Sequence, residues 1–142
     1  MEFEDVAAFQ AKTAPLPTTK TTVEFRSKGG NLLAGIRIGS LIRAKKFATV
    51  VPDGTQCASA CALAWLGGIR RFVGEHSRVV NKAGGPVESG SGNAILGAYL
   101  NQLGLSEKAI LYITHAVPTS MQWLRKRGSP AVVIWPRGTL QI

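Results

Sequence analysis

The sequence predicts a single domain of the α/β class. Its 142 residues fall within the size range of one domain, and an apolar content of 45% is enough to form a buried core. Short apolar runs alternate along the chain with stretches of helical periodicity. The order strand, helix, strand over residues 23–51 is typical of a right-handed crossover between parallel strands. We therefore expect residues 1–142 to form one α/β domain.

The N-terminal third predicts a helix, a loop and then this crossover unit. Apolar residues at helical spacing predict a helix over residues 3–12, within an N-terminal helix and loop that together span residues 1–20. The alternation that begins at Val23 predicts a strand. A glycine turn and a helix to about Lys45 follow, and residues 47–51 are interpreted as a second buried strand.

The middle of the chain predicts a buried helix followed by two strands. The helix is expected from Ala58 to Leu66, where small and apolar residues run together, and the strands over residues 71–73 and 78–80. Residues 82–92 are rich in glycine and lack apolar periodicity, so we expect an exposed, mobile loop there.

The C-terminal third predicts mainly helices. A helix capped by Ser91 or Asn93 is followed by a second helix that Ser106 caps. A short helix over residues 118–127 and a strand over residues 131–135 complete the expected elements.

The charge of the chain is strongly basic. Seventeen Lys and Arg residues against eight Asp and Glu residues give a net charge of +9. The basic residues are scattered and no nucleic-acid motif accompanies them, so we expect a soluble surface without a specific nucleic-acid partner.

No stretch is long enough for a membrane span. Without a recognisable signal, we expect a cytoplasmic protein as the chain is written, and a periplasmic one if a signal has been removed.

Two segments contain residues that could carry chemistry. Gly29 and Gly30 follow a strand at a spacing that fits no phosphate-binding motif and predicts a tight turn. Ser59 lies among small residues where a helix is expected to begin, and Cys57 and Cys61 flank it. On a continuous helix, residues four apart have nearly parallel Cβ vectors, which disfavours a disulfide, so we expect two buried thiols. No residue pattern suggests a metal or a cofactor.

These segments carry a family resemblance. Residues 23–82 resemble the Clp protease proteolytic subunit, and still more a set of uncharacterised, often periplasmic bacterial proteins related to it. Similarity to that set extends through Tyr112-Ile113-Thr114 to Trp123-Leu124 and covers most of the chain. The shared landmarks are Ser27-x-Gly29-Gly30, the helix Gly35 to Arg43, the serine of Cys57-Ala-Ser-Ala-Cys61, Arg71-Phe72 and Ser77-Arg78-Val79.

The resemblance implies a fold, a chemistry and an assembly. The fold would be crotonase-like, built from repeated β-β-α units. Ser59 matches the nucleophile of a serine peptidase, and the backbone N–H groups of Gly30 and Ala60 match the pair that holds the oxyanion. A peptide or protein would be the substrate, and relatives of this kind form rings or trimers, so a homo-oligomer is expected.

The sequence departs from this pattern at the base and at the acid. Lys82 occupies the position of the base histidine in active relatives, and no Asp or Glu follows Glu107. Lys82 acting as the base would give a serine-lysine pair, whereas a solvated lysine would stay charged. His76 and His115 are alternative bases, although an exposed turn is the better explanation of His76 and a contact with the C-terminal end of a helix explains His115.

We therefore expect a serine hydrolase homologue with a degenerate site and weak turnover or none. The alternative is a non-catalytic, oligomeric binding or scaffold protein on the same fold.

Overall fold

The computed structural model describes residues 1–81, 90–114, 122–125 and 140–141, and these residues form one small domain of mixed α/β class. The helices are α1 (Phe3–Thr13), α2 (Leu32–Ala44), α3 (Ala60–Leu66), α4 (Gly90–Gln102) and α5 (Glu107–Thr114). The strands are β1 (Thr22–Glu24), β2 (Ala48–Val51), β3 (Gln56–Ala58), β4 (Arg71–Val73), β5 (Arg78–Asn81), β6 (Gln122–Arg125) and β7 (Leu140–Gln141).

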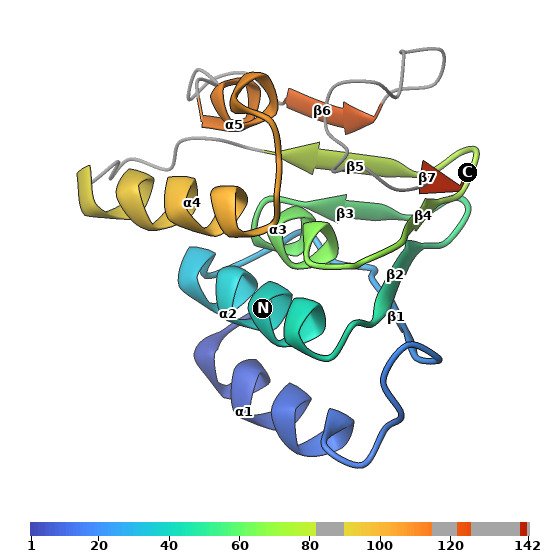
Figure 1. Cartoon of the computed structure of the whole chain (residues 1–142). Coiled ribbons are helices and arrows are strands. Elements are labelled where there is room, and N and C mark those ends of the chain that lie inside the picture. Colours follow the sequence, from blue (N-terminus) through green and yellow to red (C-terminus); the bar gives the residue numbers. More distant parts are fainter. Residues whose placement is uncertain (82–89, 115–121, 126–139, 142) are drawn as a thin grey trace.

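The described strands form two small sheets between which the chain alternates. One sheet has the order β1-β2-β4-β7 with parallel pairs throughout. The other has the order β3-β5-β6, in which β3 and β5 are parallel and β6 is antiparallel to β5. The sequence β2, β3, α3 and then β4, β5, α4 thus places successive strands in different sheets (Figure 1).

Local signals fix the ends of several helices. The Asn31 side chain accepts a hydrogen bond of 3.1 Å from the Ala34 N–H at the start of α2. The Ser106 hydroxyl accepts a hydrogen bond of 3.2 Å from the Ala109 N–H at the start of α5, as predicted from the sequence. Gly104, with a φ of 75°, lies just beyond the end of α4 and adopts the left-handed conformation that commonly terminates helices.

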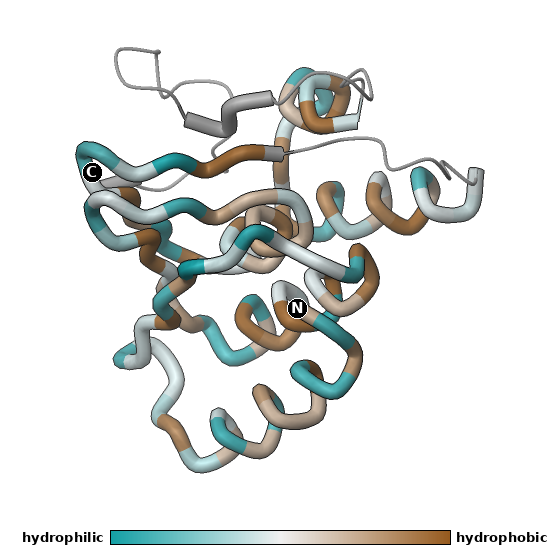
Figure 2. Tube along the Cα trace, turned by 180° about the vertical axis from the view of Figure 1, so that it is seen from behind, coloured by the Kyte–Doolittle hydropathy of each residue, from teal (hydrophilic) through white to brown (hydrophobic). Residues whose placement is uncertain are grey.

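The helices α1, α2, α3 and α4 stack beside the strands (Figure 1), and α2 packs closely against α3. Glycines make this approach possible. A Cβ atom at Gly35 would overlap the backbone of Ala60, and one at Gly67 would overlap the backbone of Gly39. In Figure 2, hydrophilic and hydrophobic residues alternate along the outer helices, as expected for helices that bury one face. The tight contact between α2 and α3 positions the first residue of α3.

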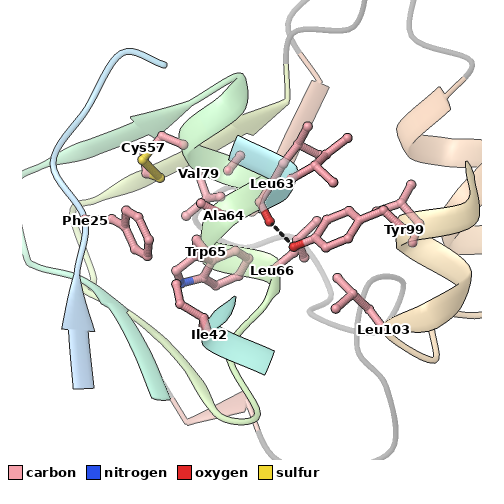
Figure 3. Packing of buried hydrophobic residues seen from close by; sticks show 14 of the residues in the cluster. Phe25, Ile42, Cys57, Leu63, Ala64, Trp65, Leu66, Val79, Tyr99 and Leu103 are labelled. Atoms are coloured by element: carbon pink, nitrogen blue, oxygen red, sulfur yellow. Dashed lines mark hydrogen bonds between the residues drawn. A yellow bond between two sulfur atoms is a disulfide. The ribbon is translucent and has the colours of Figure 1, made fainter. Parts of the chain in front are cut away.

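The centre of the core is α3, every residue of which is buried. Figure 3 shows Leu63, Trp65 and Leu66 of this helix packed among side chains from the strands and from α2 and α4. Tyr99 of α4 donates a buried hydrogen bond of 2.7 Å to the Leu63 carbonyl. Full burial of a large apolar side chain stabilises a fold by about 1.5–3 kcal/mol, so α3 anchors the region from which Ser59 projects.

The crossover predicted for residues 23–51 is confirmed, because β1 and β2 are parallel and α2 connects them. The helix at the N-terminus and the strands at β4 and β5 are also confirmed. Two expectations are wrong: Ala58, predicted to begin the buried helix, belongs to β3, and residues 122–125, predicted to be helical, form β6. Its antiparallel pairing with β5 overrides the local helical pattern.

Two further predictions concern segments that lie wholly or mostly outside the described residues. The strand expected over residues 131–135 lies outside them, as does most of the loop expected over residues 82–92. The last part of that loop is a correction, because α4 begins at Gly90. Ser91 and Asn93 therefore lie inside this helix and do not cap it, contrary to the prediction.

Candidate functional site

Ser59 lies at the junction of β3 and α3 in an unusual backbone conformation. Its φ of 55° and ψ of −125° fall where residues other than glycine are rare, at a cost of roughly 1–3 kcal/mol. Its N–H donates a hydrogen bond of 2.8 Å to the Val80 carbonyl on β5. The side chain makes no capping hydrogen bond to α3, and the residue is half-buried. The hydroxyl is therefore not used to stabilise the helix.

The predicted glycine turn packs directly against this serine. Gly29 has a φ of 105°, and a Cβ atom there would lie 2.8 Å from the Ser59 Cβ and 2.6 Å from the Ala58 carbonyl oxygen. The turn is held to β3 by a bridge between Ser27 and Cys57, and the Ser27 carbonyl accepts a hydrogen bond of 3.0 Å from the Ala58 N–H. Only glycine fits at position 29, so the fold brings together two segments that the sequence singled out separately.

The two N–H groups expected to hold an oxyanion border the same turn. Ala60 is fully buried, and its nitrogen would lie 3.2 Å from a Cβ atom at Gly29. Gly30 has a φ of 147° and lies against the backbone of Met1. The Met1 carbonyl accepts a hydrogen bond of 2.8 Å from the Asn31 N–H, and its amino group donates one of 3.0 Å to the Gly29 carbonyl. Met1 thus braces the turn next to Gly30, and the oxyanion role of both N–H groups stays a prediction.

Cys57 and Cys61 form a disulfide, which corrects the expectation of two free thiols (Figure 3). The expectation assumed a continuous helix through both residues. Instead, Cys57 belongs to β3 and Cys61 to α3, and the reversal of the chain at Ser59 brings the two Cα atoms to 5.3 Å. That separation lies within the usual range for disulfides. Both cysteines are fully buried, and Ser59 is the middle residue of the closed loop.

His76 is not close to Ser59. Its N–H donates a hydrogen bond of 2.6 Å to Asp53 Oδ1, and its Nδ1 lies 3.1 Å from Asp53 Oδ2, on turns that precede β5 and β3. Ser59 instead follows β3 at its other end and pairs with Val80 on β5, whereas Asp53 precedes β3. The hydrogen bond from the His76 backbone is the main cause that lowers the pKa of Asp53. His76 is exposed, as expected, and the pair ties two turns together.

The other two candidate bases are Lys82 and His115. Both lie outside the described residues, so their roles stay predictions.

Within the described ranges, no cluster of three His, Cys, Asp or Glu side chains could hold a metal ion. No helix among the described residues is long and apolar enough to cross a membrane.

In the sequence, Arg71 stands out only as a landmark of the family resemblance, whereas in the structure it is almost fully buried beside α3. Its guanidinium donates a hydrogen bond of 2.9 Å to the Leu66 carbonyl. Burial, together with the nearby Arg43 guanidinium, lowers the pKa of Arg71 to about 9, so the group stays charged at neutral pH. Burial also raises the pKa of Tyr99. These residues support the helix behind Ser59, and no local pattern in the sequence marks their burial.

A groove of about 280 Å³ lies between α1 and β1, lined by apolar side chains that include Phe9, Val23, Phe25 and Ile38. Ser27, which is bridged to β3, also lines it. The groove therefore borders the glycine turn.

No family model matches this chain, and no curated protein or solved structure matches it at a significant level. The mixed α/β fold and the geometry around Ser59 therefore stand on the structure itself, and the assignment to the Clp protease type stays a prediction from the sequence.

Proposed function

We propose that the protein is a serine hydrolase homologue of the Clp protease type, with a degenerate site centred on Ser59 that acts weakly or not at all on peptide or acyl bonds. The observation that carries this proposal is the conformation of Ser59. A half-buried serine lies at a strand-to-helix junction with a left-handed backbone, and its hydroxyl is not engaged in capping the helix.

The arrangement of the chain supports the same proposal. The units β2-β3-α3 and β4-β5-α4 follow the β-β-α order expected of a crotonase-like fold. The glycine turn packs against the serine, as it would if the N–H of Gly30 were to face an oxyanion. These features support the fold assignment together, since neither is specific alone.

The proposed chemistry is acyl transfer. The Ser59 hydroxyl would attack a carbonyl carbon and pass its proton to a base, and the carbonyl oxygen would become an oxyanion held by the N–H groups of Ala60 and Gly30. Loss of one such donor typically raises the barrier by about 3–4 kcal/mol. Lys82 is the proposed base. Because no Asp or Glu follows Glu107 in the sequence to orient a base, we expect weak turnover.

A non-catalytic binding or scaffold protein is the second candidate function. It is favoured by large apolar side chains that stay exposed on the described helices. Phe3 of α1 is 49% exposed, Ile95 of α4 is 43% exposed and Leu111 of α5 is 46% exposed. Apolar residues at such positions suit contacts with further subunits or with a partner protein.

Labelling with a fluorophosphonate probe, followed by intact-mass measurement, tests the proposal. We expect little labelling of the wild type. Lys82→His should label more, because a neutral imidazole can take the serine proton. Adding Ser59→Ala to that variant should abolish the labelling. Ser40→Ala is the matched control, because Ser40 is an exposed serine on α2. If Lys82 itself is a working base, the wild type labels with a rate that climbs with pH, and Lys82→Ala abolishes it.

One outcome overturns the hydrolase proposal in both forms. If neither the wild type nor Lys82→His labels while both stay folded by circular dichroism, the site cannot stabilise an oxyanion. The binding or scaffold function would then be the better account.

A further inference from the structure

The conformation of Ser59 needs a cause. With a φ of 55° and a ψ of −125°, the residue occupies a region that glycine adopts readily and serine does not. Its side chain makes no capping hydrogen bond that could favour this conformation. The hydrogen bond from the Ser59 N–H to the Val80 carbonyl, 2.8 Å long, fixes one side of the peptide. On the other side, where α3 begins, the Ser59 carbonyl accepts a hydrogen bond of 3.3 Å from the Leu63 N–H. Such a bond starts any helix and does not by itself require a positive φ.

The Cys57–Cys61 disulfide spans this point. It closes a loop of the chain whose middle residue is Ser59, and it brings the two Cα atoms to 5.3 Å. Cys57 is anchored in β3, where it is paired with Val79 of β5. Cys61 is anchored in α3, which is buried against α2. Both ends of the loop are therefore fixed to packed elements, and the residue between them has little freedom.

We propose that the Cys57–Cys61 disulfide is a positioning element for Ser59. It holds the positive-φ backbone of Ser59 at the junction between β3 and α3, directly before the Ala60 N–H. The conformational part of this proposal is independent of chemistry, whereas its consequence for labelling rests on the proposed hydrolase function. A disulfide that served only as a general staple would stabilise the fold without any link to the conformation of residue 59.

The redox state of the pair then sets the state of the site. A dithiol reductant would break the Sγ–Sγ bond, each sulfur would leave as a thiol after gaining an electron and a proton, and the reductant would become a cyclic disulfide. Disulfides persist in oxidising compartments and are rare in the reducing cytosol. Ser59 would thus be held ready in an oxidising compartment and released in a reducing one.

A thermodynamic cycle tests the conformational part. Ser59→Gly is measured by urea unfolding in the oxidised protein and in Cys57→Ala/Cys61→Ala. With the disulfide present, glycine relieves the unfavourable conformation, and we expect the folding equilibrium constant to rise about tenfold. Without the disulfide, Ser59 relaxes and glycine brings no gain. Equal effects of Ser59→Gly in the two backgrounds would overturn the proposal.

Two further measurements keep the test decisive. Alkylation under denaturing conditions, read by intact mass, should add two groups per chain only when a reductant has been used, and two additions without a reductant would overturn the proposal. If the double variant fails to fold, the same cycle is run on wild type and Ser59→Gly, oxidised and reduced with dithiothreitol.

The labelling experiment separates the two proposals. In Lys82→His, reduction of the disulfide should slow fluorophosphonate labelling at least tenfold, and unchanged labelling would overturn the positioning role. If Ser59→Gly changes the stability differently with and without the disulfide, but no variant labels, the positioning role is supported and the hydrolase function is overturned.

Discussion

Gly29 shows how little space surrounds Ser59. A side chain at this position would meet the Ala58 carbonyl and the Ser59 Cβ within 3 Å, and the backbone has a φ that favours glycine. Because both contacts lie on the β3–α3 junction, a larger residue would displace the serine itself. Gly29 thus lines the site, and a substitution there should change both the stability of the protein and the labelling of Ser59.

We predict that Gly29→Ala lowers the free energy of unfolding by about 3 kcal/mol, because the cost of a positive φ adds to the steric overlap. Urea unfolding measures this. Gly54→Ala is the matched control, since Gly54 has a φ of 70° but nothing lies within 4 Å of the position of a Cβ atom. The control should lose only about 1–2 kcal/mol. Equal losses in the two variants would show that the contact with Ser59 is unimportant.

Single residues also show where sequence reasoning succeeds and where it fails. Ser59 and the glycine turn could be identified because small residues at element boundaries are local signals. The disulfide could not, because the geometric rule applied to Cys57 and Cys61 holds only inside one helix, and the sequence does not reveal the chain reversal between them. The pairing of Asp53 with His76 joins two turns that are distant in sequence, so no local pattern predicts it.

At the scale of elements, the predictions hold where a local pattern and the tertiary structure agree. The crossover from β1 through α2 to β2 is such a case, because a strand, a glycine turn and a periodic helix follow in order. β6 is the opposite case. Its residues have a helical pattern, but the position beside β5 offers antiparallel backbone hydrogen bonds that local propensity cannot anticipate.

The turns before β3 and β5 are tied by Asp53 and His76, and this tie should depend on pH. Hydrogen bonds from His76 lower the pKa of Asp53 below its ordinary value of 3.8. A lowered carboxyl pKa contributes stability that is present above the ordinary value and is lost as the pH falls through the folded-state pKa. We predict that the wild type has a higher melting temperature than Asp53→Asn at pH 6 and that this difference becomes smaller towards pH 2. Thermal unfolding at both pH values measures it.

Glu24→Gln is the control for this prediction. Glu24 forms an exposed ion pair of 2.6 Å with Arg26, two residues away on the same segment, and such pairs contribute little. An equal effect of pH on both variants would mean that the Asp53 tie has no specific role.

The whole molecule exposes apolar side chains on several helices, and we predict that it self-associates. Phe3, Ile95 and Leu111 lie on α1, α4 and α5, so the described surface offers more than one apolar contact. Multi-angle light scattering at about 50 µM should give a mass above the 15.1 kDa of one chain. Leu111→Asp should lower that mass if α5 is in the interface. A monomeric wild type would contradict the prediction.

The alternation of the chain between the two sheets has a consequence for how the domain unfolds. β2 and β3 are consecutive but lie in different sheets, and so do β4 and β5. Neither sheet is therefore made from one continuous stretch of chain, and short connections join each sheet to the other. Local opening of a sheet would pull on its neighbour through connections of only a few residues. The domain should consequently lose its structure in a single cooperative transition, in which the disulfide-closed loop at Ser59 opens together with β3 and β5.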